Sequence, residues 1–347
     1  MSLPETKISV VMSVFNNAAD VAEAIESILV QSMISFEFII IDDASTDASL
    51  SIINRYAEQD QRIKVLSNKQ NLKLAASLNK GIAIAQGQYI ARMDADDVAF
   101  ADRLDTQFEF MQSHQDIAVC GAWVELYENK HVVWKTSTTT QGANCSTFFE
   151  SCFHHPTVMI RKSVLDKYGA YDESISTAQD CHLWSKLAFD HQQSLINLSQ
   201  VLLRYRSHPE KQREEYRADQ HAKASSLRKK NLLRLNIDTD VEQYQWHDIL
   251  CCAKPIVHQE QFRSLLNWIV FLEKQNLETQ LLHAGSFQKE LNNKFLGVCL
   301  ASAPNSIYAV IYYIKRCWKT DFFKNSYRAV RMVSLYFFSK NTDISAN

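Results

Sequence analysis

The sequence predicts an α/β fold in which a mostly parallel sheet is flanked by helices and followed by a separate helical region. Over roughly the first 210 residues, short and nearly continuous apolar runs alternate with stretches whose apolar residues recur at helical spacing. From about residue 212 onward only the helical spacing continues. We therefore expect a sheet-containing domain over 1–211 and a helical C-terminal region over 212–347.

Four apolar runs predict buried parallel strands at 8–15, 36–41, 62–66 and 88–92. Amphipathic stretches between them predict helices over 21–29, from Ser45-Thr46 onward and over 74–82. Asn16 and Asn17 are placed to cap the first helix. The alternation of strand and helix predicts right-handed crossovers and therefore brings the carboxyl ends of the strands to one edge of the sheet.

The elements expected after the fourth strand are less regular. They are a helix over 102–114, a strand over 117–127, a Ser/Thr-rich surface loop over 135–147, a return to the sheet at 153–160, a helix over 161–168 ended by Gly169, a helix from 178 and a strand over 201–205. Neither a Gly-x-Gly-x-x-Gly fingerprint nor a Walker-type phosphate loop occurs in the chain.

The composition is that of a globular protein, with 46% hydrophobic and 22% charged residues among 347. A formal net charge of −2 gives no overall attraction to nucleic acid. The eight cysteines lack any Cys-x-x-Cys pair, so we expect reduced core thiols in a cytoplasmic protein and no zinc site. We expect neither a signal peptide nor a membrane-spanning helix, since no apolar run is long enough.

Three carboxylates stand directly where the fourth strand should end: Asp94, Asp96 and Asp97. Ligands of open parallel sheets collect outside this edge. Asp94 and Asp96 leave a continuing strand on the same face, and a hard divalent cation would relieve their repulsion. The alternative is a solvated acidic turn.

Carboxylates also follow other expected elements. Asp42 and Asp43 end the second strand, where they can accept from a ring N–H of a nucleobase while Phe15 offers a stacking face; either could instead cap the next helix. Asp180 falls in the first turn of a helix and is either a general base or a charge stabilised by the helix dipole.

Several motifs follow one another in a characteristic order. They are Val-Val-Met-Ser-Val-Phe-Asn (10–16), Ile-Ile-Ile-Asp-Asp-Ala-Ser-Thr-Asp (39–47), Ser-Leu-Asn-Lys-Gly (77–81), Ala-Arg-Met-Asp-Ala-Asp-Asp (91–97), His-Pro-Thr (155–157), Gln-Asp (179–180) and Tyr-Arg-Ser-His (205–208). This order resembles family 2 glycosyltransferases, whose GT-A fold is a Rossmann-like, mostly parallel sheet. Asn-Lys-Gln-Asn (68–71) and Cys-Gly-Ala-Trp-Val-Glu-Leu (120–126) are similar to bacterial lipooligosaccharide or capsule β-1,3-N-acetylhexosaminyltransferases.

The resemblance implies an inverting, metal-dependent transferase that moves a sugar from a UDP-sugar to a cell-surface oligosaccharide precursor. GlcNAc or GalNAc is the favoured donor sugar, ahead of glucose or galactose. The implied base is Asp180, and the implied ligands of Mn²⁺ or Mg²⁺ are Asp96, Asp94 and His208. The implied donor-binding residues are Phe15, Asn16, Asp42, Asp43, Asn71, Asn79, Arg92, Asp94 and Ala95.

Two residues are candidates for the acceptor cleft, His155 and Trp184, although packing in the core is the alternative for both. The sequence departs from the family pattern at Gln179, where Glu commonly precedes the catalytic Asp. Losing that charge favours the ionised form of Asp180. Gln179 is also the one hint of another class, a non-catalytic sugar-nucleotide or glycan-binding protein. A nucleotidyltransferase is a third reading, which no phosphate-cradling loop supports.

Residues 315–340 carry seven Lys or Arg and one Asp, interleaved with aromatic residues. This mixture predicts association with an anionic bilayer, and thus a peripheral location on the inner face of the plasma membrane. The alternative is a helical subdomain that packs its aromatic residues inward. Binding to anionic vesicles that weakens with salt, and that truncation after about residue 305 abolishes, would distinguish the two.

Overall fold

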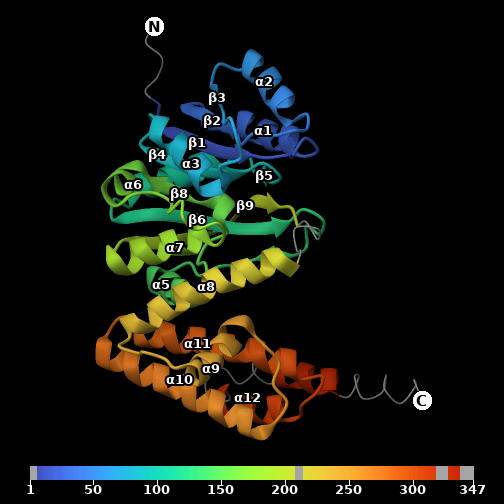
Figure 1. Ribbon diagram of the computed structural model, residues 1–347, viewed down its shortest axis with the longest axis vertical. Coiled ribbons are helices and arrows are strands. Elements are labelled where there is room, and N and C mark those ends of the chain that lie inside the picture. Colours follow the sequence, from blue (N-terminus) through green and yellow to red (C-terminus); the bar gives the residue numbers. More distant parts are fainter. Residues whose placement is uncertain (1–5, 208–213, 318–326, 337–347) are drawn as a thin grey trace, which may run out of the picture. The chain divides into compact units, whose positions relative to one another are not determined.

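The structure is a computed structural model that describes residues 6–207, 214–317 and 327–336. The chain divides into two compact units, shown in Figure 1. The first comprises 1–147 and 151–224, and the second 148–150 and 225–347. The boundary expected at 211/212 lies within 208–213, outside the described residues.

The first unit contains a mixed sheet with the strand order β3-β2-β1-β4-β8-β6-β9-β5, and β7 pairs with β6. Its first half is parallel, as predicted. There, β1 (Ile8–Val14) lies between β2 (Phe36–Asp42) and β4 (Tyr89–Asp94), and β3 (Ile63–Ser67) pairs with β2. These strands are nearly continuous apolar runs because both faces of the sheet are covered.

The second half of the sheet is less regular. β8 (Met159–Arg161) is antiparallel to both β4 and β6 (Ile117–Leu126), whereas β9 (Ser194–Tyr205) is parallel to β6. The two-residue strands β5 (Val98–Ala99) and β7 (Val133–Trp134) were not predicted, because so short a segment shows no hydrophobic period. β9 begins seven residues earlier than expected, at Ser194 rather than 201, because its first half alternates buried and partly exposed residues rather than forming an apolar run.

Helices cover both faces of this sheet. One face carries α1 (Val21–Leu29), α2 (Ser49–Gln59) and α4 (Arg103–Ser113), and the other carries α3 (Lys73–Ile84), α6 (Lys162–Tyr168) and α7 (Gln179–Ser185), which continues into the π-helical η2 (Lys186–Asp190). Val10 and Met12 of β1 face the first layer and Val11 the second, as the two-residue period of a strand requires. Gly169 ends α6 with a φ of 80°, as expected.

Three local predictions were wrong. Asp20, not Asn16 or Asn17, is the N-cap residue of α1, and α2 begins at Ser49 rather than Ser45. Only Met159 and Ile160 of the predicted strand 153–160 lie in β8, because His155–Thr157 form the 3-10 helix η1 around Pro156.

The Ser/Thr-rich stretch predicted as a surface loop contains a helix, α5 (Thr140–Phe149). Ser and Thr are weak helix formers, but the helix buries Ala143, Cys145 and Phe148 completely. Tertiary packing therefore outweighs local propensity, as it commonly does for short helices. Its last residues belong to the second unit.

The second unit is helical throughout its described part, as predicted. Its labelled helices are α8 (Glu214–Arg234), which begins in the first unit, α9 (Val241–Cys252), α10 (Gln259–Thr279), α11 (Ala284–Ser302) and α12 (Tyr308–Cys317), and residues 327–336 are helical as well. Buried Phe262, Phe287 and Phe295 contribute to its core. No helix within the described ranges is long and apolar enough to cross a membrane. The basic and aromatic segment 315–340 falls partly outside them.

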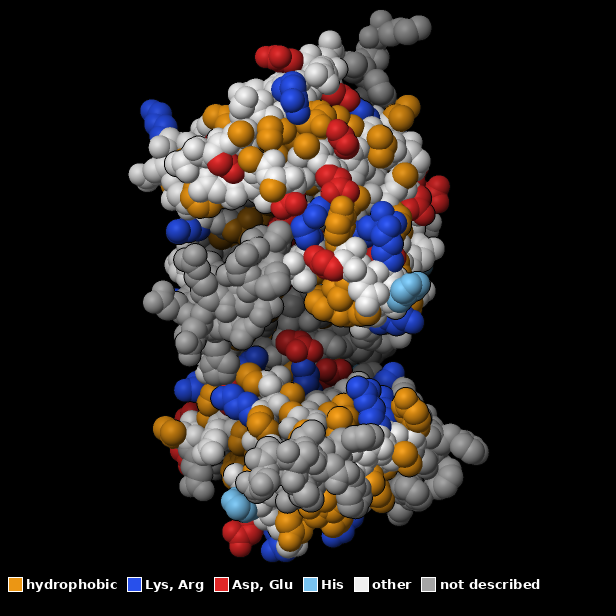
Figure 2. Space-filling model, turned by 90° about the vertical axis from the view of Figure 1, so that its right-hand side faces the viewer, with side chains coloured by type: hydrophobic (Ala, Val, Ile, Leu, Met, Phe, Trp, Pro, Cys, Tyr) orange, Lys and Arg blue, Asp and Glu red, His pale blue; other side chains and the backbone are white. Residues whose placement is uncertain are grey.

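Charged side chains of both signs are interspersed on the face shown in Figure 2, in keeping with the net charge of −2. The seven cysteines whose side chains are described form no disulfide with one another.

Candidate active site

The candidate site lies at the carboxyl ends of β1, β2 and β4. The parallel register pairs Val14 with Asp42 and Ser13 with Asp94. Asp42 and Asp94 therefore flank the end of the same central strand, although 51 intervening residues separate them in the chain. This is the edge where ligands of such sheets bind.

Hydrogen bonds join the segment after β1 to the segment after β2. The Asn16 side-chain oxygen accepts from Thr46 N–H at 2.7 Å, and the Asn16 N–H donates to Ser45 Oγ at 3.0 Å. Asn16 adopts a left-handed conformation, with a φ of 50°. Phe15 precedes this turn and is 49% exposed, so its ring remains accessible for stacking.

The two carboxylates at the end of β2 are both buried, but they differ in their partners. Asp43 accepts from Asn68 Nδ2 at 2.8 Å and from the N–H groups of Leu72 and Lys73 at 2.8 and 3.0 Å. Asp43 therefore binds the N-terminus of α3, and not of the next helix, α2. Oδ1 of Asp42 has no hydrogen-bond partner among the described residues, which leaves it available to a ligand donor.

Because Asp43 is saturated by hydrogen bonds and Asp42 is not, we expect opposite effects from replacing each with asparagine. We expect Asp43→Asn to destabilise the first unit by about 2 kcal/mol, because an amide turns an N–H toward backbone donors and loses charge-assisted hydrogen bonds. Asp42→Asn should leave the urea-unfolding midpoint nearly unchanged and weaken nucleotide binding. Equal midpoints for the two variants would contradict the assignment.

Asp94, Asp96 and Asp97 form a cluster in which one carboxylate oxygen from each lies within 4.8 Å of the others. Asp97 is fully buried; its Oδ1 accepts from Arg206 N–H at 2.8 Å, and its Oδ2 has no partner in the described part of the chain. Burial raises the pKa of Asp97 well above its usual range, and the charges of Asp94 and Asp96 raise it further. Hard oxygen donors, mutual repulsion and an unpartnered buried oxygen fit a divalent cation.

Two of the predicted metal ligands, Asp94 and Asp96, are thus brought together. Asp97, the third carboxylate of the same motif, was not among the predicted ligands. The other predicted ligand, His208, lies outside the described residues.

Arg92 precedes the cluster on β4 and is 3% exposed. Burial alone would lower the pKa of Arg92, but the charge of Asp94 and its hydrogen bond outweigh that effect, and the pKa is raised. One nitrogen, Nη2, forms an ion pair with Asp94, whereas Nε and Nη1 have no partner within the described ranges. Two buried donor nitrogens are therefore unsatisfied beside the acidic cluster, where Ala95 is also buried.

Two of the three predicted donor-binding asparagines, Asn71 and Asn79, lie at α3. Asn71 precedes the helix and accepts from Lys73 N–H at 3.2 Å. Asn79 lies within it and uses its amide on the protein itself: it donates to Tyr171 O and Glu173 Oε1, both at 2.9 Å, and accepts from Tyr171 N–H. Asn79 thus anchors the loop that carries Tyr171.

Asp180 lies in the first turn of α7, and its Oδ2 accepts from Ser151 Oγ at 3.1 Å. Tyr171 is a buried residue whose pKa reflects the charges of both this carboxylate and the acidic cluster. Burial raises the pKa of Tyr171, the charge of Arg92 opposes this, and the charges of Asp180 and Asp94 raise it further. Asp180 and Asp94 therefore act on the same buried phenol from distant parts of the sequence.

The two acceptor candidates, His155 and Trp184, have different surroundings. Burial and the charge of Arg92 hold the pKa of His155 well below its usual range, so its ring is neutral at neutral pH, and Nε2 lies 2.7 Å from Tyr171 Oη. Trp184 is completely buried and packs edge to face on Phe153, with ring centroids 5.1 Å apart. The core therefore covers the ring of Trp184, as the alternative of packing in the core predicts, and leaves no face of the ring exposed to an acceptor.

Comparisons with known proteins agree with this geometry. Residues 9–169 match the family described as Glycosyl transferase family 2. A putative glycosyltransferase, EpsE of Bacillus subtilis, is 36% identical over 203 residues, which are 58% of this chain and 73% of EpsE. An uncharacterized glycosyltransferase of Haemophilus influenzae is 27% identical over 302 residues, covering 82% of this chain and 92% of the relative.

Solved structures share the fold at low identity. The crystal structure of S. aureus TarS 1-349 in complex with UDP-GlcNAc has a TM-score of 0.54 and 16% identity, covering 98% of this chain and 92% of that one. The mannosyltransferase PcManGT from Pyrobaculum calidifontis, in complex with GDP-Man and Mn²⁺, has a TM-score of 0.51 and 15% identity, covering 97% and 87%. The chain therefore belongs to glycosyl transferase family 2 and is a glycosyltransferase with the GT-A fold.

Proposed function

We propose that this protein is an inverting, metal-dependent glycosyltransferase that uses a UDP-sugar as donor. The observation that carries the proposal is the cluster of Asp94, Asp96 and Asp97 at the strand end that Asp42 also flanks. The UDP-GlcNAc complex of TarS and the GDP-Man and Mn²⁺ complex of PcManGT support a nucleotide-sugar donor and a divalent ion.

The donor would be held by groups that the protein leaves unsatisfied or exposed. Phe15 can stack on the uracil while Asp42 Oδ1 accepts from its ring N–H. Asn16, Asp43 and Asn71 shape the backbone around this position. The free N–H groups of Arg92 can donate to the sugar or the phosphates.

Asp94, Asp96 and Asp97 would hold Mn²⁺ or Mg²⁺, joined by His208 as the resemblance implies. When bound, the ion would stabilise the negative charge that develops on the departing diphosphate.

Asp180 would act as the general base. Ser151 donates to Oδ2 and so helps to orient the carboxylate, which would take the proton from an acceptor hydroxyl. The acceptor oxygen then forms a bond to the anomeric carbon as the bond to the diphosphate breaks and UDP leaves with the electron pair. A single displacement inverts the configuration, so an α-linked donor gives a β-linkage.

We further propose GlcNAc or GalNAc as the transferred sugar, ahead of glucose or galactose, and a lipooligosaccharide or capsule precursor as the acceptor. An anionic membrane surface on the cytoplasmic side would present such an acceptor. Exposed Tyr327, Val330 and Arg331 in the described part of the C-terminal segment support this contact.

A thermal-shift screen of nucleotide sugars with and without Mn²⁺ tests the proposal. We expect UDP-sugars with Mn²⁺ to raise the melting temperature more than GDP-sugars or nucleoside triphosphates, because a ligand that binds only the native state stabilises it. Metal-dependent hydrolysis of the stabilising donor should accompany the shift. Binding without turnover would favour a sugar-nucleotide-binding protein, and release of pyrophosphate from a triphosphate would favour a nucleotidyltransferase.

A further inference from the structure

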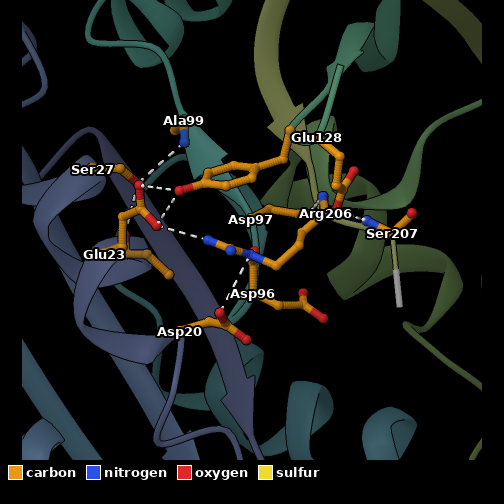
Figure 3. A network of polar contacts seen from close by, with 11 residues as sticks. Asp20, Glu23, Ser27, Asp96, Asp97, Ala99, Glu128, Arg206 and Ser207 are labelled. Carbon is orange, nitrogen blue, oxygen red and sulfur yellow. Dashed lines mark hydrogen bonds and ion pairs between the residues drawn. The ribbon is translucent and has the colours of Figure 1, made fainter. Parts of the chain in front are cut away.

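Arg206 follows β9 and reaches three other parts of the first unit, as Figure 3 shows. Its guanidinium Nε donates to the main-chain oxygen of Asp96 at 2.9 Å and lies 3.4 Å from Asp20 Oδ1, and its Nη2 donates to Glu23 Oε2 at 2.7 Å. The same group lies over the ring of Tyr127, 3.8 Å from its centroid. Four residues therefore contact the side chain of Arg206, and 17% of it is exposed.

The main chain of Arg206 contacts a second residue of the acidic cluster, Asp97. The N–H of Arg206 donates to Asp97 Oδ1 at 2.8 Å. Tyr127 completes the arrangement: its N–H donates to Tyr205 O at 2.8 Å, and its hydroxyl lies 3.1 Å from both carboxylate oxygens of Glu23. Arg206 thus holds the main-chain oxygen of Asp96 with its side chain and the carboxylate of Asp97 with its main-chain N–H.

Arg206 also changes the local balance of charge. Asp20 and Glu23 of the α1 segment would otherwise add two negative charges beside a cluster that already contains three carboxylates. The guanidinium neutralises part of this charge and connects it to the acidic loop. Groups that hydrogen-bond the ligands of a metal commonly set both their orientation and the affinity of the site.

We propose that Arg206 is a positioning residue for the divalent-cation site, which it organises by fixing the Asp96–Asp97 segment against α1 and Tyr127. This inference rests on the proposed metal dependence of the enzyme. It assigns a role to a residue that does not itself need to touch the ion or the donor.

The chain offers a matched control in Arg204, two residues earlier on β9. Arg204 also pairs with a carboxylate, Glu125, with its Nε 2.5 Å from Oε1, and also lies over an aromatic ring, that of Phe100, at 4.8 Å. None of its described side-chain contacts involves the acidic cluster. Arg204→Ala therefore removes the same kinds of side-chain interaction two residues away, without removing any contact to the Asp96–Asp97 segment.

The test is a titration of the full-length protein with Mn²⁺ in the absence of nucleotide, with free Mn²⁺ followed by electron paramagnetic resonance. We expect Arg206→Ala to raise the Kd for Mn²⁺ about tenfold and Arg204→Ala to leave it unchanged, while both variants lower the melting temperature to a similar degree. In the donor-hydrolysis assay, Arg206→Ala should need more Mn²⁺ for half-maximal rate but approach the wild-type kcat at saturating Mn²⁺.

Two further variants separate charge from geometry. Arg206→Lys keeps the charge but cannot reach Glu23 and the Asp96 carbonyl together, so its Kd should fall between wild type and Arg206→Ala. Glu23→Ala removes the Nη2 acceptor and should raise the Kd by less than Arg206→Ala does, which also provides a measurement should Arg206→Ala fold poorly.

Equal Kd values for Arg206→Ala and Arg204→Ala, or a wild-type Kd in Glu23→Ala, would overturn the inference. If UDP-sugar turnover proceeds in wild type without any Mn²⁺ or Mg²⁺ binding, the metal site and this inference fall together while the transferase assignment stands. If Mn²⁺ binds and weakens in Arg206→Ala but no donor sugar is turned over, the proposed reaction fails and the positioning role remains.

Discussion

Asp180→Asn is expected to abolish sugar transfer while leaving nucleotide binding intact. An amide of the same shape can still accept from Ser151, but it cannot take a proton from the acceptor hydroxyl. General base catalysis typically contributes about 10²- to 10⁴-fold, so we expect a loss of kcat in this range. Transfer to an acceptor and binding of UDP, measured on the same preparation, check the two halves of the prediction.

Asp166→Asn serves as the control for this experiment. Asp166 lies on α6, where it forms an exposed ion pair with Lys162 at 2.9 Å, and such pairs contribute little to stability. The control should keep wild-type turnover. Near-normal turnover by Asp180→Asn would refute its role as the base, and loss of UDP binding in that variant would place Asp180 in the donor site instead.

Asp96→Asn is expected to abolish the response of the enzyme to divalent metal. We expect donor turnover to fall by about two orders of magnitude or more, because a carboxylate ligand is lost and its neighbours are left without the ion. The metal-free protein should melt at the same or a slightly higher temperature, since one of three mutually repelling charges is removed. Adding Mn²⁺ should then give no further rise.

Asp102→Asn is the matched control for the metal experiment. Asp102 is an exposed carboxylate at the start of α4, six residues along the chain, and its side chain makes no capping hydrogen bond. The Mn²⁺-induced rise in melting temperature should be unchanged in this variant. A rise of wild-type size in Asp96→Asn would show that the cluster does not bind the ion.

The apolar pattern was sufficient for the parallel half of the sheet because it depends on local spacing alone. β1, β2 and β4 are buried on both faces, and continuous apolar runs have few other stable arrangements. The helix α5 shows where this reasoning ends. Its Ser/Thr-rich sequence gives no local signal, and only the burial of Ala143 and Phe148 by residues distant in the chain makes it helical.

In the candidate site, too, some features could be inferred from the sequence and others depend on tertiary packing. Asp94 and Asp96 follow an apolar strand, so their position could be inferred from the sequence. The distinct environments of Asp42 and Asp43 could not, because only the position of α3 decides which of the two neighbouring carboxylates is saturated. Trp184 is a second example, since burial depends on what packs against the ring.

By itself, the sequence determined the α/β architecture, the helical C-terminal region and the acidic strand end, because hydrophobic periodicity and the order of motifs are local properties. Only the tertiary structure decided which polar atoms remain unsatisfied and that Arg206 holds the acidic segment from more than a hundred residues away. The physical reason is that hydrogen-bond saturation and desolvation depend on which distant groups meet, and no spacing within one segment encodes that.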